Sequence, residues 1–322
     1  MKTIFDMLTG FAYTNVLHSL VSTGIIDKID KDPKSLHQIA QDCDLNEDVL
    51  YRLLRFAIAM GVINLNGDNY NLTESGSLLS KDHPRSMSTA VRLVCSEPWQ
   101  KSWANVSKSV ATGVPAFDET FGDNFFSYLD KHPQYGIPYN KWMTANSASI
   151  APLIVNSYNF SNASTVCDIA GGQGYLLSAI LGANPDLKGI LFDQDNTISN
   201  HFIHEFDNRV TAIAGNFFEK VPSSDIMIMK NIIHDWNDRD ALKILDSCKR
   251  AMLPDSKLLI IDMIIGEEAD VTGYFYDLHM QVLLGGKERT KVEFEDLIKT
   301  AGLKMVNIIK TGSPMYIIEV TL

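Results

Sequence analysis

The pattern of apolar and polar residues divides the chain into a helical first part and a second part in which strands and helices alternate. Apolar residues recur at helical spacing over 11–21 and over 46–60, where Asn46 is placed to cap the second helix. Within 62–72, Asn-Gly-Asp separates two short apolar runs, which predicts a β-hairpin. Helix, turn, helix and hairpin in this order predict a winged-helix-like domain over residues 1–95.

Residues 96–160 have the pattern of short connecting helices broken by Gly and Pro. This segment is rich in Trp, Phe and Tyr. Most of these rings are expected in the core, and a minority to line an apolar pocket for a flat ligand. We therefore predict that 96–160 contributes to a substrate pocket.

From residue 161 onward short apolar runs alternate with helical patterns, as in a parallel sheet. The predicted strands are 166–169, 189–192, 210–214, 226–229 and 258–262. Two further strands, 304–309 and 315–322, are joined only by a turn and must therefore pair antiparallel. The predicted fold class is α/β: a Rossmann-like, mostly parallel sheet closed by an antiparallel C-terminal hairpin, following a helical winged-helix-like domain.

Charge argues against nucleic acid as a partner. The formal net charge is −11, and residues 1–90 hold 8 Lys and Arg against 11 Asp and Glu. Because DNA binding requires clustered positive charge, a winged-helix regulator is a distant alternative, and we expect the first domain to serve packing or dimerisation. The four cysteines lie far apart, the first residues lack the apolar core of a signal peptide, and no run is long enough to span a membrane. These features predict a cytoplasmic protein without a membrane partner.

A glycine cluster follows the first strand of the predicted sheet. The acidic residue Asp168 precedes Gly171, Gly172 and Gly174, and a helical pattern begins directly afterwards. Glycines let the backbone approach a ligand closely, and the start of a helix offers free N–H groups. The alternative is an ordinary tight turn, which three glycines within four residues make the weaker interpretation.

The ligand of this turn is narrowed by two observations. The dinucleotide fingerprint requires another glycine where Leu177 stands, so a pyrophosphate cofactor is disfavoured. Asp193, at the end of the second strand, is placed to accept hydrogen bonds from a ribose, which NAD and S-adenosylmethionine sites share. The terminal hairpin and the missing glycine favour S-adenosyl-L-methionine.

The chain also resembles a family: the S-adenosylmethionine-dependent small-molecule O-methyltransferases, which include plant caffeic acid and isoflavone O-methyltransferases and bacterial enzymes of natural-product metabolism. The resemblance extends over nearly the whole chain and rests on several motifs together. They are Asp168-Ile-Ala-Gly-Gly-Gln-Gly174, Phe192-Asp193, Gly215-Asn-Phe-Phe218, Lys230-Asn-Ile-Ile-His-Asp-Trp236, Ile244-Leu-Asp-Ser-Cys-Lys-Arg-Ala251 and Gly285-Gly-Lys-Glu-Arg-Thr290.

The resemblance implies an enzyme that methylates a hydroxyl group of a small molecule. It implies a homodimer formed through the N-terminal domain, which also helps to complete the partner's substrate pocket. Beside the glycine turn and Asp193, it places Asn216, Phe217 and Lys230 on the cofactor side. It also implies a substrate-lining role for three residues: Tyr139, Met143 and Met280.

His234 follows the fourth strand, at the edge of the sheet where ligands bind, and the resemblance implies that it is the general base. The same comparison implies that Asp262 and Glu288 flank and orient it. A carboxylate beside an imidazole selects its tautomer and supports its charged form. Without the resemblance, a buried structural His, a strand-end Asp and a solvated Glu are the ordinary alternatives.

The free energy of deprotonation limits which kind of hydroxyl group can accept the methyl group. Deprotonating a phenol of pKa about 10 at pH 7 costs roughly 4 kcal/mol, which is within the roughly 3–5 kcal/mol that a positioned base contributes. An aliphatic alcohol would require roughly 12 kcal/mol. A neutral His234 therefore suits a phenolic hydroxyl on a flat aromatic or polyketide-like molecule. No carboxylate cluster typical of a magnesium site accompanies His234, so we predict metal-independent chemistry.

Three positions depart from the family pattern, one of them Asn231, which stands directly after Lys230 where the family commonly has Trp. Ala170 replaces a usual Gly and is expected to keep a common backbone conformation, and Asn216 replaces an Asp that in the family touches the adenosine. Cofactor affinity is thus left open. A relative on the same scaffold that catalyses decarboxylation, hydroxylation or pericyclic chemistry is the second interpretation, which the His234, Asp262 and Glu288 set disfavours.

Overall fold

The computed structural model describes residues 3–199, 201, 203–206, 208–266 and 271–322. The chain folds as two compact units, one formed by Met1–Lys101 with His132–Trp142 and the other by Ser102–Lys131 with Met143–Leu322. Helices α8 (Glu97–Ala104) and α12 (Pro133–Ser157) contain residues of both units. Among the described helices, none is both long and apolar enough to cross a membrane.

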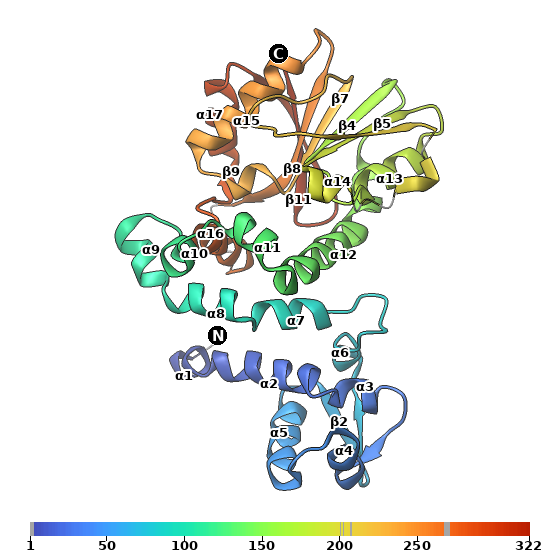
Figure 1. Cartoon of the computed structure of the whole chain (residues 1–322), viewed down its shortest axis with the longest axis vertical. Coiled ribbons are helices and arrows are strands. Elements are labelled where there is room, and N and C mark those ends of the chain that lie inside the picture. The colour runs from blue at the N-terminus through green and yellow to red at the C-terminus, as the bar shows by residue number, and fades with distance from the viewer. Residues whose placement is uncertain (1–2, 200, 202, 207, 267–270) are drawn as a thin grey trace. The chain divides into compact units, whose positions relative to one another are not determined.

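The first unit is mainly helical and carries a small three-stranded sheet in the order β1-β3-β2 (Figure 1). Its elements are α1 (Ile4–Leu8), α2 (Gly10–Ser22), α3 (Ile25–Ile29), β1 (Lys34–Ser35), α4 (Leu36–Cys43), α5 (Glu47–Ala59), β2 (Ile63–Asn66), β3 (Asn69–Leu72), α6 (Glu74–Ser77) and α7 (Ser88–Val94). Asn46 caps α5, its Oδ1 accepting from the Val49 N–H at 3.0 Å. In the hairpin, Gly67 adopts the positive φ of 61° that a two-residue loop requires.

The second unit contains a large sheet flanked by helices. Its strands are β4 (Thr165–Ile169), β5 (Lys188–Asp193), β6 (Val210–Ala214), β7 (Ile226–Lys230), β8 (Lys257–Ile265), β9 (Arg289–Thr290), β10 (Lys304–Lys310) and β11 (Met315–Thr321). Its helices are α9 (Val106–Thr112), α10 (Ala116–Phe121), α11 (Phe125–Lys131), α13 (Tyr175–Ala183), α14 (Asp195–Ile198), α15 (Asp238–Ala251), α16 (Val271–Leu283) and α17 (Lys291–Thr300), with 3₁₀ helices at Ile203–Phe206 and Ile233–Asp235.

The strand order of this sheet is β10-β11-β8-β7-β4-β5-β6, with β9 pairing the end of β8. Neighbouring strands from β8 through β6 are parallel, whereas β11 is antiparallel to both β8 and β10. The predicted fold class, a mostly parallel Rossmann-like sheet closed by an antiparallel hairpin after a helical domain, is confirmed.

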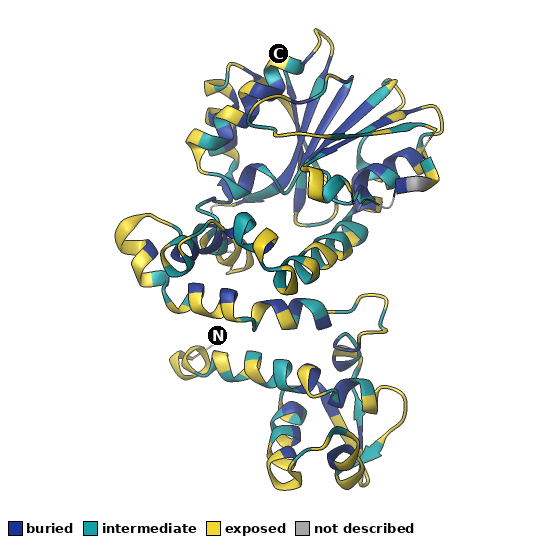
Figure 2. Cartoon of the chain, in the orientation of Figure 1, coloured by how far each residue is buried: buried dark blue, intermediate teal, exposed yellow. Residues whose placement is uncertain are grey.

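Helices cover both faces of the sheet, so its central strands are buried on both sides (Figures 1 and 2). One apolar cluster joins one face of the sheet to residues of α15 and α17, such as Leu245 and Phe294. The other joins the opposite face to α13 and the end of α12, through residues such as Leu177 and Ile154. Burial on both faces explains why these strands are nearly continuous apolar runs rather than alternating patterns.

The register of the parallel strands brings their carboxyl ends to one edge. Asp168 lies opposite Leu191 on β5 and Ile228 on β7, and Lys230 lies opposite Ile261 on β8. Asp168, Asp193 and Lys230 lie at or next to the ends of their strands, and Asp262 follows Ile261 on the longer β8, so these polar residues gather along a single edge of the sheet.

Candidate active site

The glycine-rich turn joins β4 to α13 at this edge. Gly172 and Gly174 have positive φ angles of 61° and 89°, and Gly174 is the N-cap residue of α13. Ala170 also has a positive φ, 55°, so the expectation that it keeps a common backbone conformation is wrong. The reason is tertiary: its N–H donates to the Phe192 carbonyl of β5 at 2.7 Å, which holds the chain in a conformation that costs an L-residue about 1–2 kcal/mol.

Gly171 is required by the packing of Asp168. A Cβ at Gly171 would lie 2.7 Å from both Cγ and Oδ2 of Asp168 and 2.7 Å from Cδ1 of Leu191. Asp168 is 1% exposed, and its Oδ2 has no hydrogen-bond partner among the described residues. Burial raises the pKa of Asp168 to about 7, with Lys230 lowering it and Asp193 raising it. A buried acceptor without a donor fits a ligand that brings a donor or a positive charge.

Asp193 closes the other side of the turn. Its Oδ2 accepts from the Gly172 N–H at 2.8 Å, and its Oδ1 accepts from the Gln194 N–H at 2.7 Å. Burial raises the pKa of this carboxyl although both bonds oppose the shift. Each carboxylate oxygen can accept more than one hydrogen bond, so Asp193 retains capacity for ligand hydroxyls.

The remaining residues expected on the cofactor side differ in their surroundings. Asn216 is exposed, and its Oδ1 accepts from the Phe218 N–H at 3.0 Å, which closes its own turn. The Phe217 ring packs edge-on against Phe218 at 4.8 Å between centroids. Burial lowers the pKa of Lys230, while Asp168 and two other aspartates counteract the shift.

His234 lies in the 3₁₀ helix that follows β7, with 8% of its surface exposed. Its Nδ1 is 2.7 Å from Oε1 of Glu288, and its Nε2 is 3.4 Å from Oδ1 of Asp235. In the neutral imidazole, the bond to Glu288 places the proton on Nδ1 and leaves Nε2 free to accept one. The structure thus brings His234 and Glu288 together, as expected, and adds Asp235, which sequence reasoning did not single out although it lies in the same motif.

Carboxyl groups surround this imidazole. Burial by itself favours neutral His234, but Asp235, Glu288 and Asp262 outweigh it and raise the pKa of His234 to about 10. Burial likewise raises the pKa of Asp235 to about 6 and that of Asp262 to about 7, although the charge of His234 opposes both shifts. These carboxyl groups therefore favour the protonated form of His234, and a positive charge nearby would favour the neutral form.

Asp262 and Glu288 are both deeply buried beside His234. Asp262 is 0% exposed, and neither of its carboxyl oxygens has a hydrogen-bond partner among the described residues. Glu288 is 3% exposed, and its Oε2 is likewise without a partner there. These oxygens can still accept hydrogen bonds within the site. Their negative charge acts strongly on His234 because the surroundings have a low dielectric constant.

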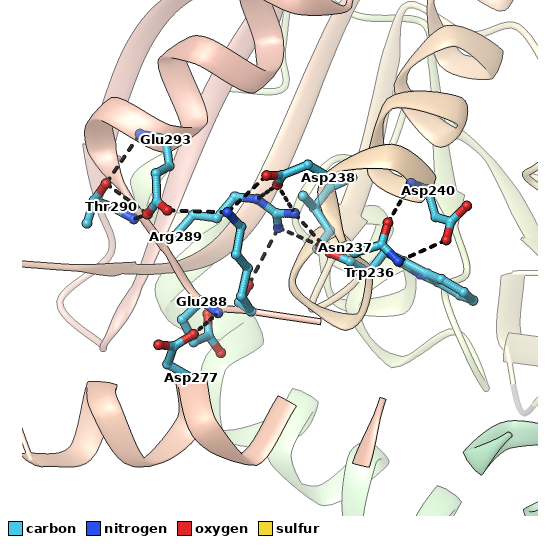
Figure 3. Close-up of polar contacts among 11 residues, drawn as sticks. Trp236, Asn237, Asp238, Asp240, Asp277, Glu288, Arg289, Thr290 and Glu293 are labelled. Atoms are coloured by element: carbon cyan, nitrogen blue, oxygen red, sulfur yellow. Dashed lines mark hydrogen bonds and ion pairs between the residues drawn. The ribbon is translucent and has the colours of Figure 1, made fainter. Parts of the chain in front are cut away.

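The segment 285–290 holds the His234 turn from the side. The Lys287 N–H donates to the His234 carbonyl at 2.9 Å, and Gly286 approaches so closely that a Cβ would lie 2.0 Å from that oxygen. The Arg289 side chain is 0% exposed. It donates to the carbonyls of Ile233 and Trp236, both at 2.9 Å, and to Asp238 at 2.8 Å (Figure 3). Sequence reasoning did not assign these roles to Gly286 and Arg289, although both residues belong to the 285–290 motif.

The three residues expected to line the substrate pocket are distributed over both units. Tyr139 belongs to the first unit, where its ring lies 6.3 Å from that of Trp99. Met143 and Met280 belong to the second unit, Met143 half-buried and Met280 8% exposed on α16. Their role in binding a substrate stays a prediction.

These features together define a class of enzymes that bind a nucleoside cofactor at the edge of the sheet. They are a parallel sheet with a glycine-rich turn after its first strand, an acidic residue at the end of its second strand, and an antiparallel closing hairpin. Residues 103–304 match the O-methyltransferase domain, and residues 5–82 match the O-methyltransferase dimerisation domain. The chain is 34% identical over 323 residues to the phenazine O-methyltransferase PhzM of Lysobacter antibioticus, covering 98% of this chain and 94% of that protein.

Solved structures agree. The mitomycin 7-O-methyltransferase MmcR superimposes with a TM-score of 0.92 at 30% identity, covering 99% of this chain and 96% of that one. The O-methyltransferase NcsB1 from neocarzinostatin biosynthesis, solved with S-adenosylmethionine and 2-hydroxy-5-methyl naphthoic acid, gives 0.84 at 27% identity and covers 96% of each chain. The chain belongs to the O-methyltransferase family. It is an S-adenosyl-L-methionine-dependent O-methyltransferase, as predicted.

Proposed function

We propose that this enzyme methylates a phenolic hydroxyl of a small, flat aromatic molecule without a metal ion, with His234 taking the hydroxyl proton. The observation that carries the proposal is the buried His234–Glu288 pair, 2.7 Å apart, at the sheet edge that carries the glycine-rich turn. The pair leaves Nε2 as the proton acceptor. Asp262 and Asp235 supply negative charge that stabilises the imidazolium once it forms.

The cofactor side supports this proposal. Gly171 and Gly172 let the backbone approach the ligand, Asp193 has capacity for ribose hydroxyls, and the unpartnered Oδ2 of Asp168 suits an ammonium donor. When bound, S-adenosylmethionine supplies a methyl group on a positively charged sulfur. Phe217 and Lys230 complete this side, and Asn216 holds the turn that presents Phe217.

The proton balance explains why a cation should bind first. His234 has a pKa of about 10 in the chain by itself, so it is protonated at pH 7. A positive charge at the neighbouring cofactor site disfavours the imidazolium and lowers that pKa. The same positive charge also lowers the pKa of a bound phenol from its usual value of about 10, so acid and base shift in the same direction, and methyl transfer then consumes the phenolate.

Similar proteins support a flat molecule as the acceptor of the methyl group. The similar proteins include an enzyme named for phenazine and a structure that contains a hydroxynaphthoic acid. For this chain we place Met143, Met280 and Tyr139 on the acceptor side, with residues 96–160 contributing to the pocket. Thioether and aromatic side chains suit planar rings because they are polarizable.

We place dimerisation in residues 1–95. The match of 5–82 to a dimerisation domain supports this assignment. So do the apolar side chains of α1 and α2: Ile4 and Phe5 are each 72% exposed and Phe11 is 71% exposed. Such residues are costly to leave in water and are typical of a surface that a second copy covers.

The test compares wild type with His234→Ala, using labelled S-adenosylmethionine and a panel of phenols and anilines. Loss of a positioned base predicts a fall of about 10²–10⁴-fold in methylation of phenols. Calorimetric binding of S-adenosylhomocysteine to both proteins controls for an intact cofactor site. Equal turnover by the two would refute the role of His234 as base, and turnover of anilines alone would replace the phenol by an amine.

A further inference from the structure

Helix α16 is hydrogen-bonded to the segment that carries Glu288, the partner of the base. The Glu288 N–H donates to Oδ1 of Asp277 at 3.1 Å, and the Gly285 N–H donates to the Met280 carbonyl at 3.0 Å. His279 lies two residues after Asp277 and directly before Met280 on this helix. Asp277 contacts Glu288, and Glu288 in turn contacts His234, so this part of α16 packs against the segment that supports the base. His279 is therefore a second imidazole near this site.

Two aromatic rings hold His279 in place. Its ring is nearly parallel to that of Trp103, with an interplanar angle of 17°, and to that of Phe275, with an angle of 19°. Trp103 and Phe275 are themselves parallel within 5°, with centroids 5.6 Å apart. The three rings form a flat-sided cluster from α8 and α16, and all three belong to the second unit.

One hydrogen bond determines the tautomer of His279. Trp103 Nε1 lies 3.0 Å from His279 Nδ1. The indole nitrogen can only donate, so Nδ1 of His279 must accept and the single proton of the neutral ring lies on Nε2. Burial, followed by the charge of His234, lowers the pKa of His279 to about 4, so the ring stays neutral through the working pH range. No described residue accepts from this Nε2–H.

A neutral imidazole whose N–H donor is fixed on Nε2 selects a particular acceptor chemistry. We propose that His279 is a substrate-binding residue that donates its Nε2–H to an uncharged hydrogen-bond acceptor, a carbonyl oxygen or a ring nitrogen, next to the hydroxyl that is methylated. The inference rests on the proposed phenol methylation and adds the substrate class. His234 then takes the proton from the hydroxyl while His279 holds the neighbouring atom.

The opposite arrangement is disfavoured by the same geometry. A substrate group that must donate to His279 would find no free lone pair, because Nδ1 already accepts from Trp103. A carboxylate would gain more from a cationic partner, and a neutral imidazole does not provide one. The acceptor that fits best is polar and uncharged.

The experiment uses two acceptors of the same shape, 8-hydroxyquinoline and 1-naphthol, which differ by the ring nitrogen beside the hydroxyl. Wild type should prefer the quinoline by about 5- to 10-fold in kcat/KM, the value of one good neutral hydrogen bond. His279→Phe keeps a ring but removes the donor, and should abolish this preference, so that kcat/KM falls about 5- to 10-fold further for 8-hydroxyquinoline than for 1-naphthol. His279→Gln can donate through its amide and should restore part of the preference.

Two measurements keep this test separate from that of the proposed function. Calorimetric binding of the same pair to the S-adenosylhomocysteine complex does not depend on turnover, so a binding preference lost in His279→Phe supports the proposal even if neither compound is methylated. The ¹⁵N shifts of His279 should report the Nε2–H tautomer in wild type and a mixture in Trp103→Phe. Equal losses for both acceptors, no preference in wild type or no binding of either compound would overturn the proposal.

Discussion

Gly286 offers the sharpest test of how the His234 turn is positioned. A Cβ built there would lie 2.0 Å from the carbonyl oxygen of His234, and 2.4 Å from the carbonyl carbon and 2.7 Å from the carbonyl oxygen of Asp235. All three are backbone atoms, which cannot rotate away as a flexible side chain can. Gly286→Ala therefore forces the two segments apart, and the hydrogen bond from the Lys287 N–H to His234 at 2.9 Å is the first to be strained.

The size of the effect follows from the distances. Real Cβ atoms keep about 3.0 Å or more from such neighbours, so the His234 backbone must move by about 1 Å relative to Gly286. A displacement of about 1 Å at a catalytic group costs on the order of 10²-fold in rate. We expect kcat to fall by about 10²-fold, with cofactor affinity almost unchanged because the glycine turn at 171–174 is untouched.

The assay is steady-state methylation of a phenol, with S-adenosylhomocysteine binding and thermal unfolding measured in parallel. Gly182→Ala is the matched control, because Gly182 lies within α13 and a Cβ there would meet only Phe206 Cζ at 3.9 Å, an ordinary van der Waals contact. That change should leave activity unaltered and add about 0.5–1 kcal/mol of stability. If folded Gly286→Ala retains kcat within about threefold of wild type, contact with the 285–290 segment does not position His234.

Asp262→Asn should shift the acidic limb of the pH–activity profile to lower pH by roughly 1 unit or more. Removing a negative neighbour lowers the pKa of His234, so the neutral base is present at lower pH. An unmoved limb would show that Asp262 does not act on the base. Arg289→Met should lower the free energy of unfolding by about 2–5 kcal/mol in urea titrations, since the carbonyls of Ile233 and Trp236 lose their buried donor. Lys243→Met, at an exposed lysine, is the control for this variant. A loss below about 1 kcal/mol for Arg289→Met would show that the Arg289 side chain does not stabilise the His234 turn.

Local pattern was sufficient for much of the fold. The apolar runs that predicted five parallel strands correspond to β4 through β8, and the pair without a crossover helix is antiparallel in the structure. Capping residues could also be predicted: Asn46 caps α5, as expected. These features depend on side-chain periodicity and on residues a few positions apart, which a sequence displays directly.

The site could be predicted only in part. Position at the end of a strand identified Asp168, Asp193 and His234 as residues of one sheet edge, because parallel strands end together. The resemblance added Glu288, and the 2.7 Å contact with His234 joins residues 54 positions apart. That Asp235 lies 3.4 Å from the same imidazole required the 3₁₀ turn of the structure.

Tertiary structure alone decided the contacts that no local sequence pattern can predict. Ala170 was expected in a common conformation and instead takes a φ of 55°, because its N–H is bound to β5. Gly286 and Arg289 owe their roles to the turn against which they pack, and His279 owes its tautomer to Trp103, which lies 176 positions away. The sequence by itself determined which elements form and in what order. Packing decided which side chains meet, because that depends on distances between segments that the chain brings together only when it folds.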